Sequence, residues 1–230
     1  TAKLAELALE NAFKTSAHFS KLEVNLRLSV NIPVPALVKI SVEDIVKAHR
    51  PASEKWPGLI IDLPEEQIVN DLKLAGELSK KLEPHNVRLA IDNFGRAYST
   101  LAKAEEMPFE ELKLDKSFVQ DMHVHSSERT LVEAVVAMGR SLDLDVVAEG
   151  VEAAHQVQLL REMGCRYAQG YHFSRPVPIE NFGLAAERVA DVDPEAAPFG
   201  ARARSTEAHE LGRAVVERVD DLGERLLRVV

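Results

Sequence analysis

Cysteine is nearly absent from the 230 residues of this chain, where Cys165 stands alone. A single cysteine excludes a disulfide within the chain and any zinc site built from several cysteines, and it favours a reducing compartment. No apolar run approaches the roughly 18 to 20 residues that span a bilayer, and no signal-peptide pattern opens the chain. We therefore expect a soluble, cytoplasmic protein with no transmembrane segment in this chain.

Positive charge is also scarce. Lysine and arginine number 28 against 37 aspartate and glutamate residues, which gives a formal net charge of −9. Such a surface does not suit bulk binding of nucleic acid, although a local basic pocket could still hold a phosphate ligand. The P-loop and the glycine fingerprint of dinucleotide-binding folds are missing. The hydrophobic content of 46% is enough for a sizeable core.

What the chain does have is an alternation of β-prone segments and helical patterns. The clearest helix is Arg129–Leu142, and others are expected near 65–82 and 152–163. Alternation at this pitch predicts a parallel sheet with helical crossovers, because parallel neighbours need a long return connection. A closed eightfold barrel usually needs about 250 residues, so the sheet is open or the first barrel elements lie before Thr1. The expected strands are Leu22–Ile32, Gly58–Leu63, Val87–Ile91, Glu111–Leu114, Asp145–Ala148 and Arg166–Phe173.

The pattern changes after residue 190. Residues 191–207 are rich in proline and alanine and predict a linker. Apolar residues then recur at alternating spacings of four and three, which predicts an amphipathic helix over 208–230 that packs back on the domain or against a second copy. These residues are Val215, Val219, Leu222, Leu226 and Val229. The expected organisation is a barrel-like domain at 1–190, a linker at 191–207 and a C-terminal helix.

Acids, amides and one lysine stand near the carboxyl ends of the expected strands. An Asp-Asn pair is an ordinary turn former, so one such strand end would not by itself indicate a functional site. In barrels of this type, however, the carboxyl rim is the functional face, and this inventory suits oxygen-ligated divalent cations with a charged substrate. The residues are Asn31, Asp62, Asp92, Asn93, Lys113, Asp115, Glu149, Glu152 and Gln169.

Histidines offer a weaker metal candidate. His123 and His125 have a strand-like spacing that could suit a metal ion. No strand pattern or third ligand surrounds them in the sequence, so we interpret them as solvated loop residues.

Five segments, in order and at family-like spacings, resemble the EAL family of bacterial domains. That family binds or hydrolyses cyclic di-GMP on a modified TIM (β/α)8 barrel. The resemblance covers about residues 1–182 and implies a barrel whose N-terminal elements are incomplete in this chain, a possible homodimer and an upstream sensory or signalling domain. The segments are SVNIP from Ser29, AIDNFGRAYSTL from Ala90, ELKLDKSFV from Glu111, VVAEGVEAAHQ from Val146 and QGYHFSRP from Gln169.

The resemblance also implies roles for single residues. Active members use two Mg²⁺ or Mn²⁺ ions to cleave cyclic di-GMP to linear pGpG. Lys113 and Glu149 would serve catalysis, with Lys113 orienting or polarising the attacking water. Metal ligands would come from Asn31, Asp62, Asp92, Asn93, Glu149 and Gln169, and support for the substrate and its loops from Glu65, Arg96, Asp115 and Glu152.

Departures from the family pattern bear on activity. No strand with the Glu-Ala-Leu motif precedes the first helix, and Asp62 stands where the family has a longer glutamate. Asn93 replaces the second acid of a pair, which makes the second ion doubtful because clustered dications need anionic ligands. Arg96 replaces a small polar residue and could contact a phosphate or add a competing positive charge. We expect a degenerate domain that binds cyclic di-GMP or a protein partner with weak or absent hydrolysis. The alternatives are an active metal-dependent phosphodiesterase that produces pGpG and a nucleotide-free scaffold for protein interactions.

Overall fold

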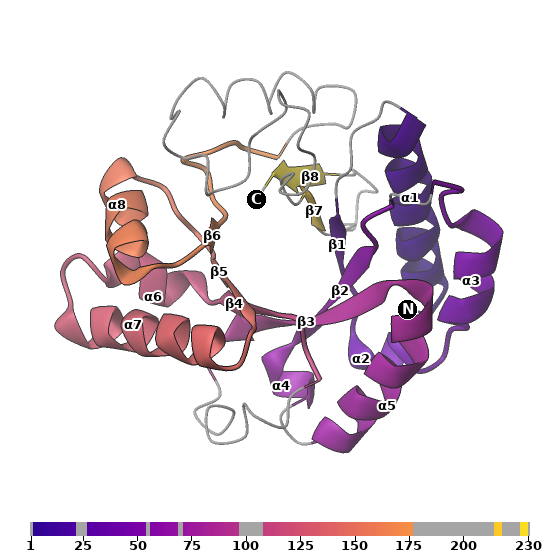
Figure 1. Cartoon of the computed structure of the whole chain (residues 1–230), viewed down its shortest axis with the longest axis horizontal. Coiled ribbons are helices and arrows are strands. Elements are labelled where there is room, and N and C mark those ends of the chain that lie inside the picture. Colours follow the sequence, from indigo (N-terminus) through magenta and orange to yellow (C-terminus); the bar gives the residue numbers. More distant parts are fainter. Residues whose placement is uncertain are drawn as a thin grey trace.

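The computed structural model describes residues 2–21, 27–53, 56–68, 71–96, 108–176, 214–217 and 226–229. A curved parallel sheet forms its centre, and helices cover the outer side (Figure 1). Each expected strand is present, and the last is shorter than the sequence predicted; residues 22–26 of the expected first strand lie outside the described residues. The strands are β1 (Leu28–Asn31), β2 (Leu59–Pro64), β3 (Val87–Phe94), β4 (Glu111–Leu114), β5 (Asp145–Ala148) and β6 (Tyr167–Ala168).

These six strands lie side by side in chain order, and every neighbouring pair is parallel. Parallel pairing in chain order brings all their carboxyl ends to one edge of the sheet. The β1–β2 register, for example, sets Asn31 at the end of β1 opposite Asp62, two residues before the end of β2. A curved sheet of this order with outer helices has the architecture of a (β/α)8-type barrel, as the sequence predicted.

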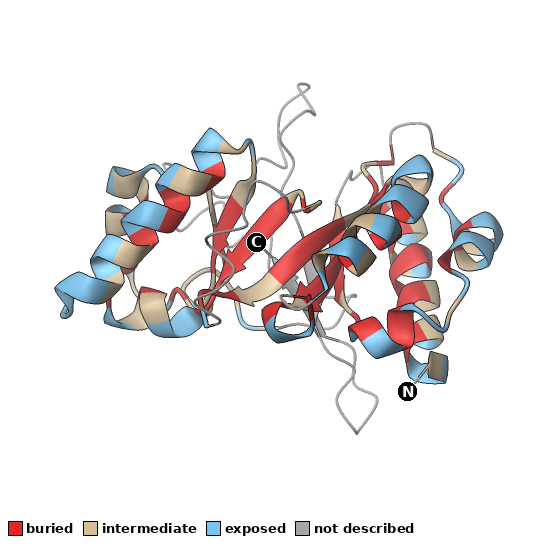
Figure 2. Ribbon diagram, turned by 90° about the horizontal axis from the view of Figure 1, so that it is seen from below, coloured by how far each residue is buried: buried red, intermediate tan, exposed pale blue. Residues whose placement is uncertain are grey.

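The helices bury the faces that lie toward the sheet and expose the faces that point outward (Figure 2). In α7, for example, Val132, Val135 and Val136 are buried at helical spacing. No strand precedes α1 among the described residues, and the helix expected near 65–82 is divided into α4 and α5. The helices are α1 (Ala2–Lys21), α2 (Val34–Leu37), α3 (Val42–His49), α4 (Glu65–Ile68), α5 (Leu72–Leu82), α6 (Lys116–Asp121), α7 (Ser126–Ser141) and α8 (Ala154–Met163), with a 3-10 turn η1 (Glu83–His85).

One hydrophobic core joins the sheet to these helices, and every residue from Leu59 to Leu63 is buried. Cys165 belongs to this core, and burial raises the pKa of its thiol to about 11. None of the described helices is both long enough and apolar enough to cross a membrane.

The C-terminal segment differs from the predicted helix over 208–230. The structure has two short strands there, β7 (Ala214–Glu217) and β8 (Leu226–Val229). β7 pairs in parallel with β1, and β8 pairs antiparallel with β7. The helix prediction is wrong at these eight residues, because β-branched Val215 and Val216 suit a strand and the edge of β1 offers unpaired backbone groups. The predicted linker at 191–207 lies outside the described residues.

Candidate functional site at the carboxyl ends of the strands

A bulge in β3 shapes the centre of the site. Ile91 pairs with Leu112 and Phe94 with Leu114, so Asp92 and Asn93 together face the single residue between them on β4, Lys113. Asn93 has a φ of 57°, and its backbone N–H donates to Asp92 Oδ1 at 2.9 Å. Asparagine tolerates this left-handed conformation better than most residues. Because a bulge re-aims side chains, it turns this acid-amide pair toward the rim.

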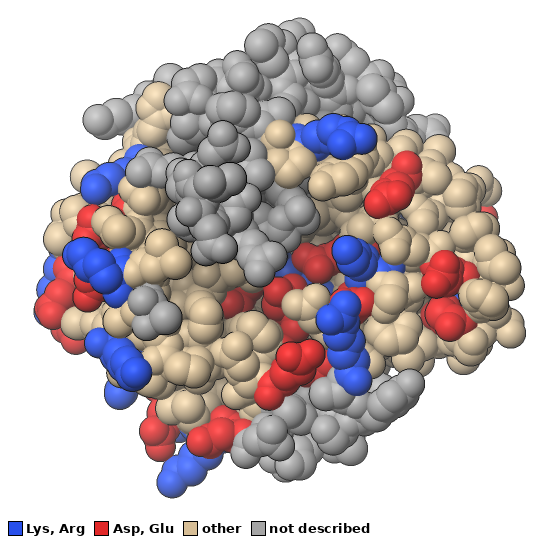
Figure 3. Space-filling view, turned by 180° about the vertical axis from the view of Figure 1, so that it is seen from behind, with Lys and Arg blue, Asp and Glu red and all other residues tan. Residues whose placement is uncertain are grey.

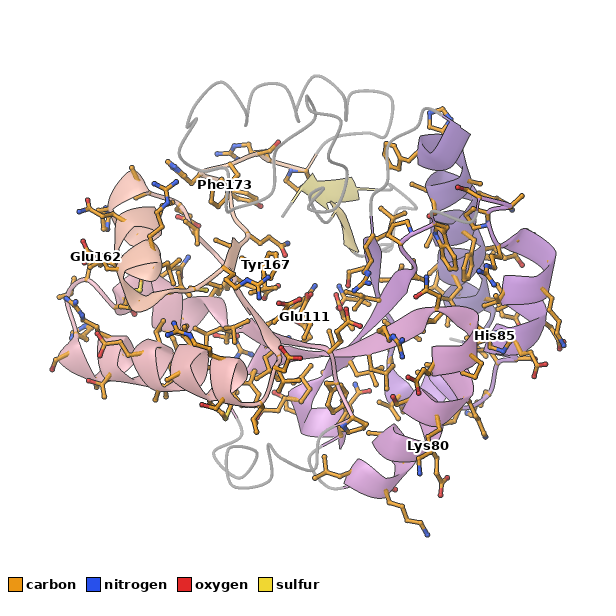
Figure 4. All side chains as sticks on the ribbon, in the orientation of Figure 1. Lys80, His85, Glu111, Glu162, Tyr167 and Phe173 are labelled. Carbon is orange, nitrogen blue, oxygen red and sulfur yellow. The ribbon has the colours of Figure 1, made fainter. Side chains whose placement is uncertain are left out.

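Lys113 lies on the inner side of the curved sheet. Side chains two residues apart on a strand share a face, and Glu111 on the same strand lies on the inner side together with Tyr167, whereas Lys80 and Glu162 lie outside among the helices (Figure 4). Lys113 is 2% exposed, and its ammonium group forms an ion pair with the fully buried Asp62.

Carboxylates keep Lys113 charged despite its burial. Burial lowers the pKa of this amine, but the negative charges of Asp62, Glu149 and Asp92 together outweigh that effect, so its pKa is raised above the ordinary value. The structure therefore brings together one cation and three acids from the ends of β2, β3, β4 and β5, all predicted as site residues.

Two buried acids hold the turn after β3 from opposite sides. Glu65, at the start of α4, accepts a hydrogen bond from the backbone N–H of Gly95 at 3.0 Å. Asp115 forms an ion pair with Arg96 Nε at 2.8 Å and also caps α6 by accepting from the backbone N–H of Ser117 at 2.9 Å. The position of Asp92 is thus linked to the ends of both neighbouring strands.

The loop after β5 carries Glu149 and Glu152. Glu149 donates its backbone N–H to Leu114 O at 3.2 Å, which fixes it beside the end of β4. Glu152 is exposed, and its carboxylate accepts a hydrogen bond from Gln120 at 3.3 Å.

Gln156 is a residue of this loop region that the sequence reasoning missed. Its side-chain oxygen accepts from the backbone N–H groups of Glu152 at 2.7 Å and Ala153 at 2.9 Å, and its amide nitrogen donates to Val119 O at 3.3 Å. The buried side chain thereby joins the loop to both α6 and α8. A glutamine placed three residues into a helix is the one available signal, since it matches half of a capping box.

Gln169 and Asp62 leave buried polar atoms without a partner. Gln169 follows β6 and is 1% exposed, and neither its side-chain oxygen nor its nitrogen has a hydrogen-bond partner among the described residues. The same holds for Asp62 Oδ1. Buried polar atoms are almost always paired, so these atoms have hydrogen-bonding capacity that the described residues do not use. Asn31 is half-buried beside Asp62 in the β1–β2 register.

The donor atoms suit a divalent cation in kind. Carboxylate and amide oxygens from Asn31, Asp62, Asp92, Glu149 and Gln169 are the hard ligands that Mg²⁺ and Mn²⁺ prefer. Within the described residues, however, no three His, Cys, Asp or Glu side chains are close enough together to form a metal site. The ion pair between Lys113 and Asp62 occupies one oxygen of this set.

Charges of both signs mix on the face shown in Figure 3, where blue and red side chains alternate over the described surface. No broad field of one sign is visible there. This distribution agrees with a local site for a small charged ligand better than with a large polyanion-binding surface.

Comparison with known proteins places this arrangement in a family. Residues 1–176 match the model of the EAL domain. The chain is 32% identical over 175 residues to the signaling protein YkoW of Bacillus subtilis, covering 76% of this chain and 22% of YkoW. It is 36% identical over 155 residues to the cyclic di-GMP phosphodiesterase NbdA of Pseudomonas aeruginosa, covering 67% of this chain and 20% of NbdA.

A solved structure agrees with these matches. The PaMucR phosphodiesterase in complex with c-di-GMP superposes with a TM-score of 0.67 at 29% identity, covering 78% of this chain and 74% of that one. The chain spans only about a fifth of the length of the curated relatives named above. The match over residues 1–176 and the parallel barrel-like sheet lead to one conclusion. This chain belongs to the EAL domain family, a family of cyclic di-GMP signalling.

Proposed function

We propose that this chain binds cyclic di-GMP at the carboxyl rim of its sheet and hydrolyses it weakly or not at all. The proposal is based mainly on two buried groups at that rim, the Gln169 amide and Asp62 Oδ1, which have no hydrogen-bond partner among the described residues. Such groups are costly to bury unless a ligand pairs with them. The c-di-GMP complex of the similar PaMucR domain supports this choice of ligand.

The charged groups of the rim suit a phosphodiester. Lys113 stays protonated among Asp62, Asp92 and Glu149, so it can orient a phosphate oxygen or a water molecule while remaining in place. Asn31, Asp62, Asp92, Glu149 and Gln169 would hold a divalent cation. When bound, such cations neutralise phosphate oxygens and activate water.

Two side chains argue for weak hydrolysis. Asn93 contributes no negative charge where a second cation would need one, and two dications repel strongly without anionic ligands. Asp62 is one methylene shorter than glutamate and already pairs with Lys113. Arg96 is engaged by Asp115, so we assign it to support of the turn after β3 rather than to direct competition with a cation.

An active metal-dependent phosphodiesterase that produces pGpG is the second candidate. The placement of charged Lys113 among three carboxylates favours it, since this is the group that would orient the attacking water. As further proposals, the domain covers 1–190, is cytoplasmic, forms a homodimer and works with an upstream sensory domain.

The test measures binding and hydrolysis separately. The purified chain is incubated with Mn²⁺ and cyclic di-GMP, pGpG is quantified by chromatography, and affinity is measured by titration calorimetry with Ca²⁺ in place of Mn²⁺. We expect a binding isotherm and little or no pGpG. Robust production of pGpG would show that the chain is an active phosphodiesterase and overturn the proposal of weak hydrolysis. A flat isotherm at high nucleotide concentration would show that the chain is a scaffold that binds no nucleotide.

A further inference from the structure

Two histidines that are far apart in the sequence meet at the junction of α6 and α8. His123 follows the end of α6, and His155 lies in the first turn of α8. Their ring centroids are 4.7 Å apart with an angle of 62° between the planes, and both residues are exposed. The sequence reasoning compared His123 with His125, but the structure pairs it with His155 instead.

The hydrogen bond of His123 fixes which ring nitrogen can bind a metal. Its Nδ1 lies 3.0 Å from Gln120 O. A carbonyl oxygen only accepts, so Nδ1 carries the proton and Nε2 keeps a lone pair. Metal-binding histidines commonly donate their other ring N–H to a backbone carbonyl in this way, which fixes the orientation of the ring.

The spacing of the rings also fits a shared metal ion. With metal–nitrogen distances of about 2.0–2.1 Å, two imidazoles on one ion have centroids roughly 4.5 Å apart at a right angle and roughly 5.2 Å apart at a tetrahedral angle. The observed 4.7 Å falls between these values. A small change of side-chain rotamer, available to exposed residues, would turn both lone pairs toward one point.

We propose that His123 and His155 form a second metal site, which binds one Zn²⁺, Ni²⁺ or Cu²⁺ ion. Imidazole nitrogen is a borderline ligand that suits these ions, whereas the oxygen donors of the carboxyl rim suit Mg²⁺ and Mn²⁺. Because no group of three metal-binding side chains occurs in the described part of the chain, water molecules complete the coordination.

The proposed histidine site lies at a junction between α6 and α8 that other contacts already cross. The contacts of Gln120 with Glu152 and of Gln156 with Val119 O cross the same junction. A bound ion would add a link between α6 and the start of α8, next to the loop that carries Glu149. Its occupancy would therefore stiffen that loop.

The experiment titrates metal alone into the full chain. The protein is treated with EDTA, dialysed and saturated with Mg²⁺, and Zn²⁺ is then added in a calorimeter. The variants are His123→Ala and His155→Ala, with His125→Ala as the matched control because that exposed histidine lies two residues from the pair. Thermal unfolding of each variant checks the fold, and Cu²⁺ electron paramagnetic resonance reports how many nitrogens bind.

We expect one Zn²⁺ per chain, a loss of affinity of about tenfold or more in each pair variant, and no change in His125→Ala. The Cu²⁺ spectrum should show two coupled nitrogens in the wild type and one in either pair variant. Equal affinity in wild type and both pair variants, or an equal loss in His125→Ala, would overturn the proposal and show weak surface binding only.

Discussion

Asn93 affects both the backbone conformation of β3 and the charge of the candidate site. Its left-handed φ lies within the β3 bulge, where asparagine is favoured over most side chains, and the register places it with Asp92 opposite Lys113 on β4. Sequence reading identified Asn93 from the family pattern as a weakened ligand. It could not identify the bulge, because a bulge depends on the register with β4.

Asn93→Asp should strengthen binding of the second cation. The added carboxylate supplies a charge that offsets repulsion between two dications, so we expect Mn²⁺ to bind about tenfold more tightly at that step, or about 1.4 kcal/mol. Calorimetry on the EDTA-treated protein measures it. Asn86→Asp is the matched control, because Asn86 has the same φ of 57° and lies at the end of η1. An unchanged second step would contradict our account of the site.

Lys113→Met should destabilise the fold. It removes the partner of fully buried Asp62, and an unpaired buried charge costs about 3–5 kcal/mol. Urea denaturation measures the loss. The double variant Lys113→Met with Asp62→Asn should lose less than the sum of the two single variants, since the pair is coupled. Simple additivity would show that the ion pair contributes little.

Elements differ in how well the sequence predicts them. The β2, β3, β4 and β5 strands were predicted because each is a short apolar run between turn signals, and burial in the sheet confirms this. The C-terminal strands were missed because the spacing of the apolar residues alone suggested a helix, whereas pairing with the edge of β1 favours a strand. The role of Gln156 was missed because its partners are backbone groups, and its position three residues into a helix, half of a capping box, is a weak signal.

Gln156→Leu should loosen the loop after β5. Two backbone N–H groups, of Glu152 and Ala153, lose their acceptor, so we expect a loss of about 2–4 kcal/mol in the free energy of unfolding. Gln156→Glu keeps the acceptor oxygen and should lose less. Gln158→Leu on the same helix is the control, because its exposed contact with Glu162 contributes little. Equal stability of the Gln156→Leu variant and the wild-type protein would rule out the proposed link.

At the scale of the whole molecule, the strand order explains why site residues distant in sequence meet. Every crossover returns the chain to the amino edge of the sheet, so all six parallel strands end at the opposite, carboxyl edge. Each strand end adds one or two groups to that single rim. This much follows from the alternation of strands and helices. The meeting of His123 and His155 does not, because it depends on how two outer helices pack.

Amide hydrogen exchange should be slowest in β2 and β3. Both are flanked by strands on each side and are mostly buried, whereas β6 has only two residues. Local opening is cheapest where few buried contacts must break. Mass spectrometry of exchanged peptides measures the order. Faster exchange in β3 than in β6 would contradict this picture.

The ion pair between Lys113 and Asp62 joins strands that are not neighbours, since β3 lies between β4 and β2. Strands two places apart are roughly 10 Å apart in a flat sheet. The pair reaches across the concave side of β3, and its closure depends on how tightly the sheet bends. The distance between the Lys113 and Asp62 side chains therefore depends on sheet curvature. A substitution elsewhere that flattens the sheet would separate them and change the geometry of the site, although no site residue is replaced.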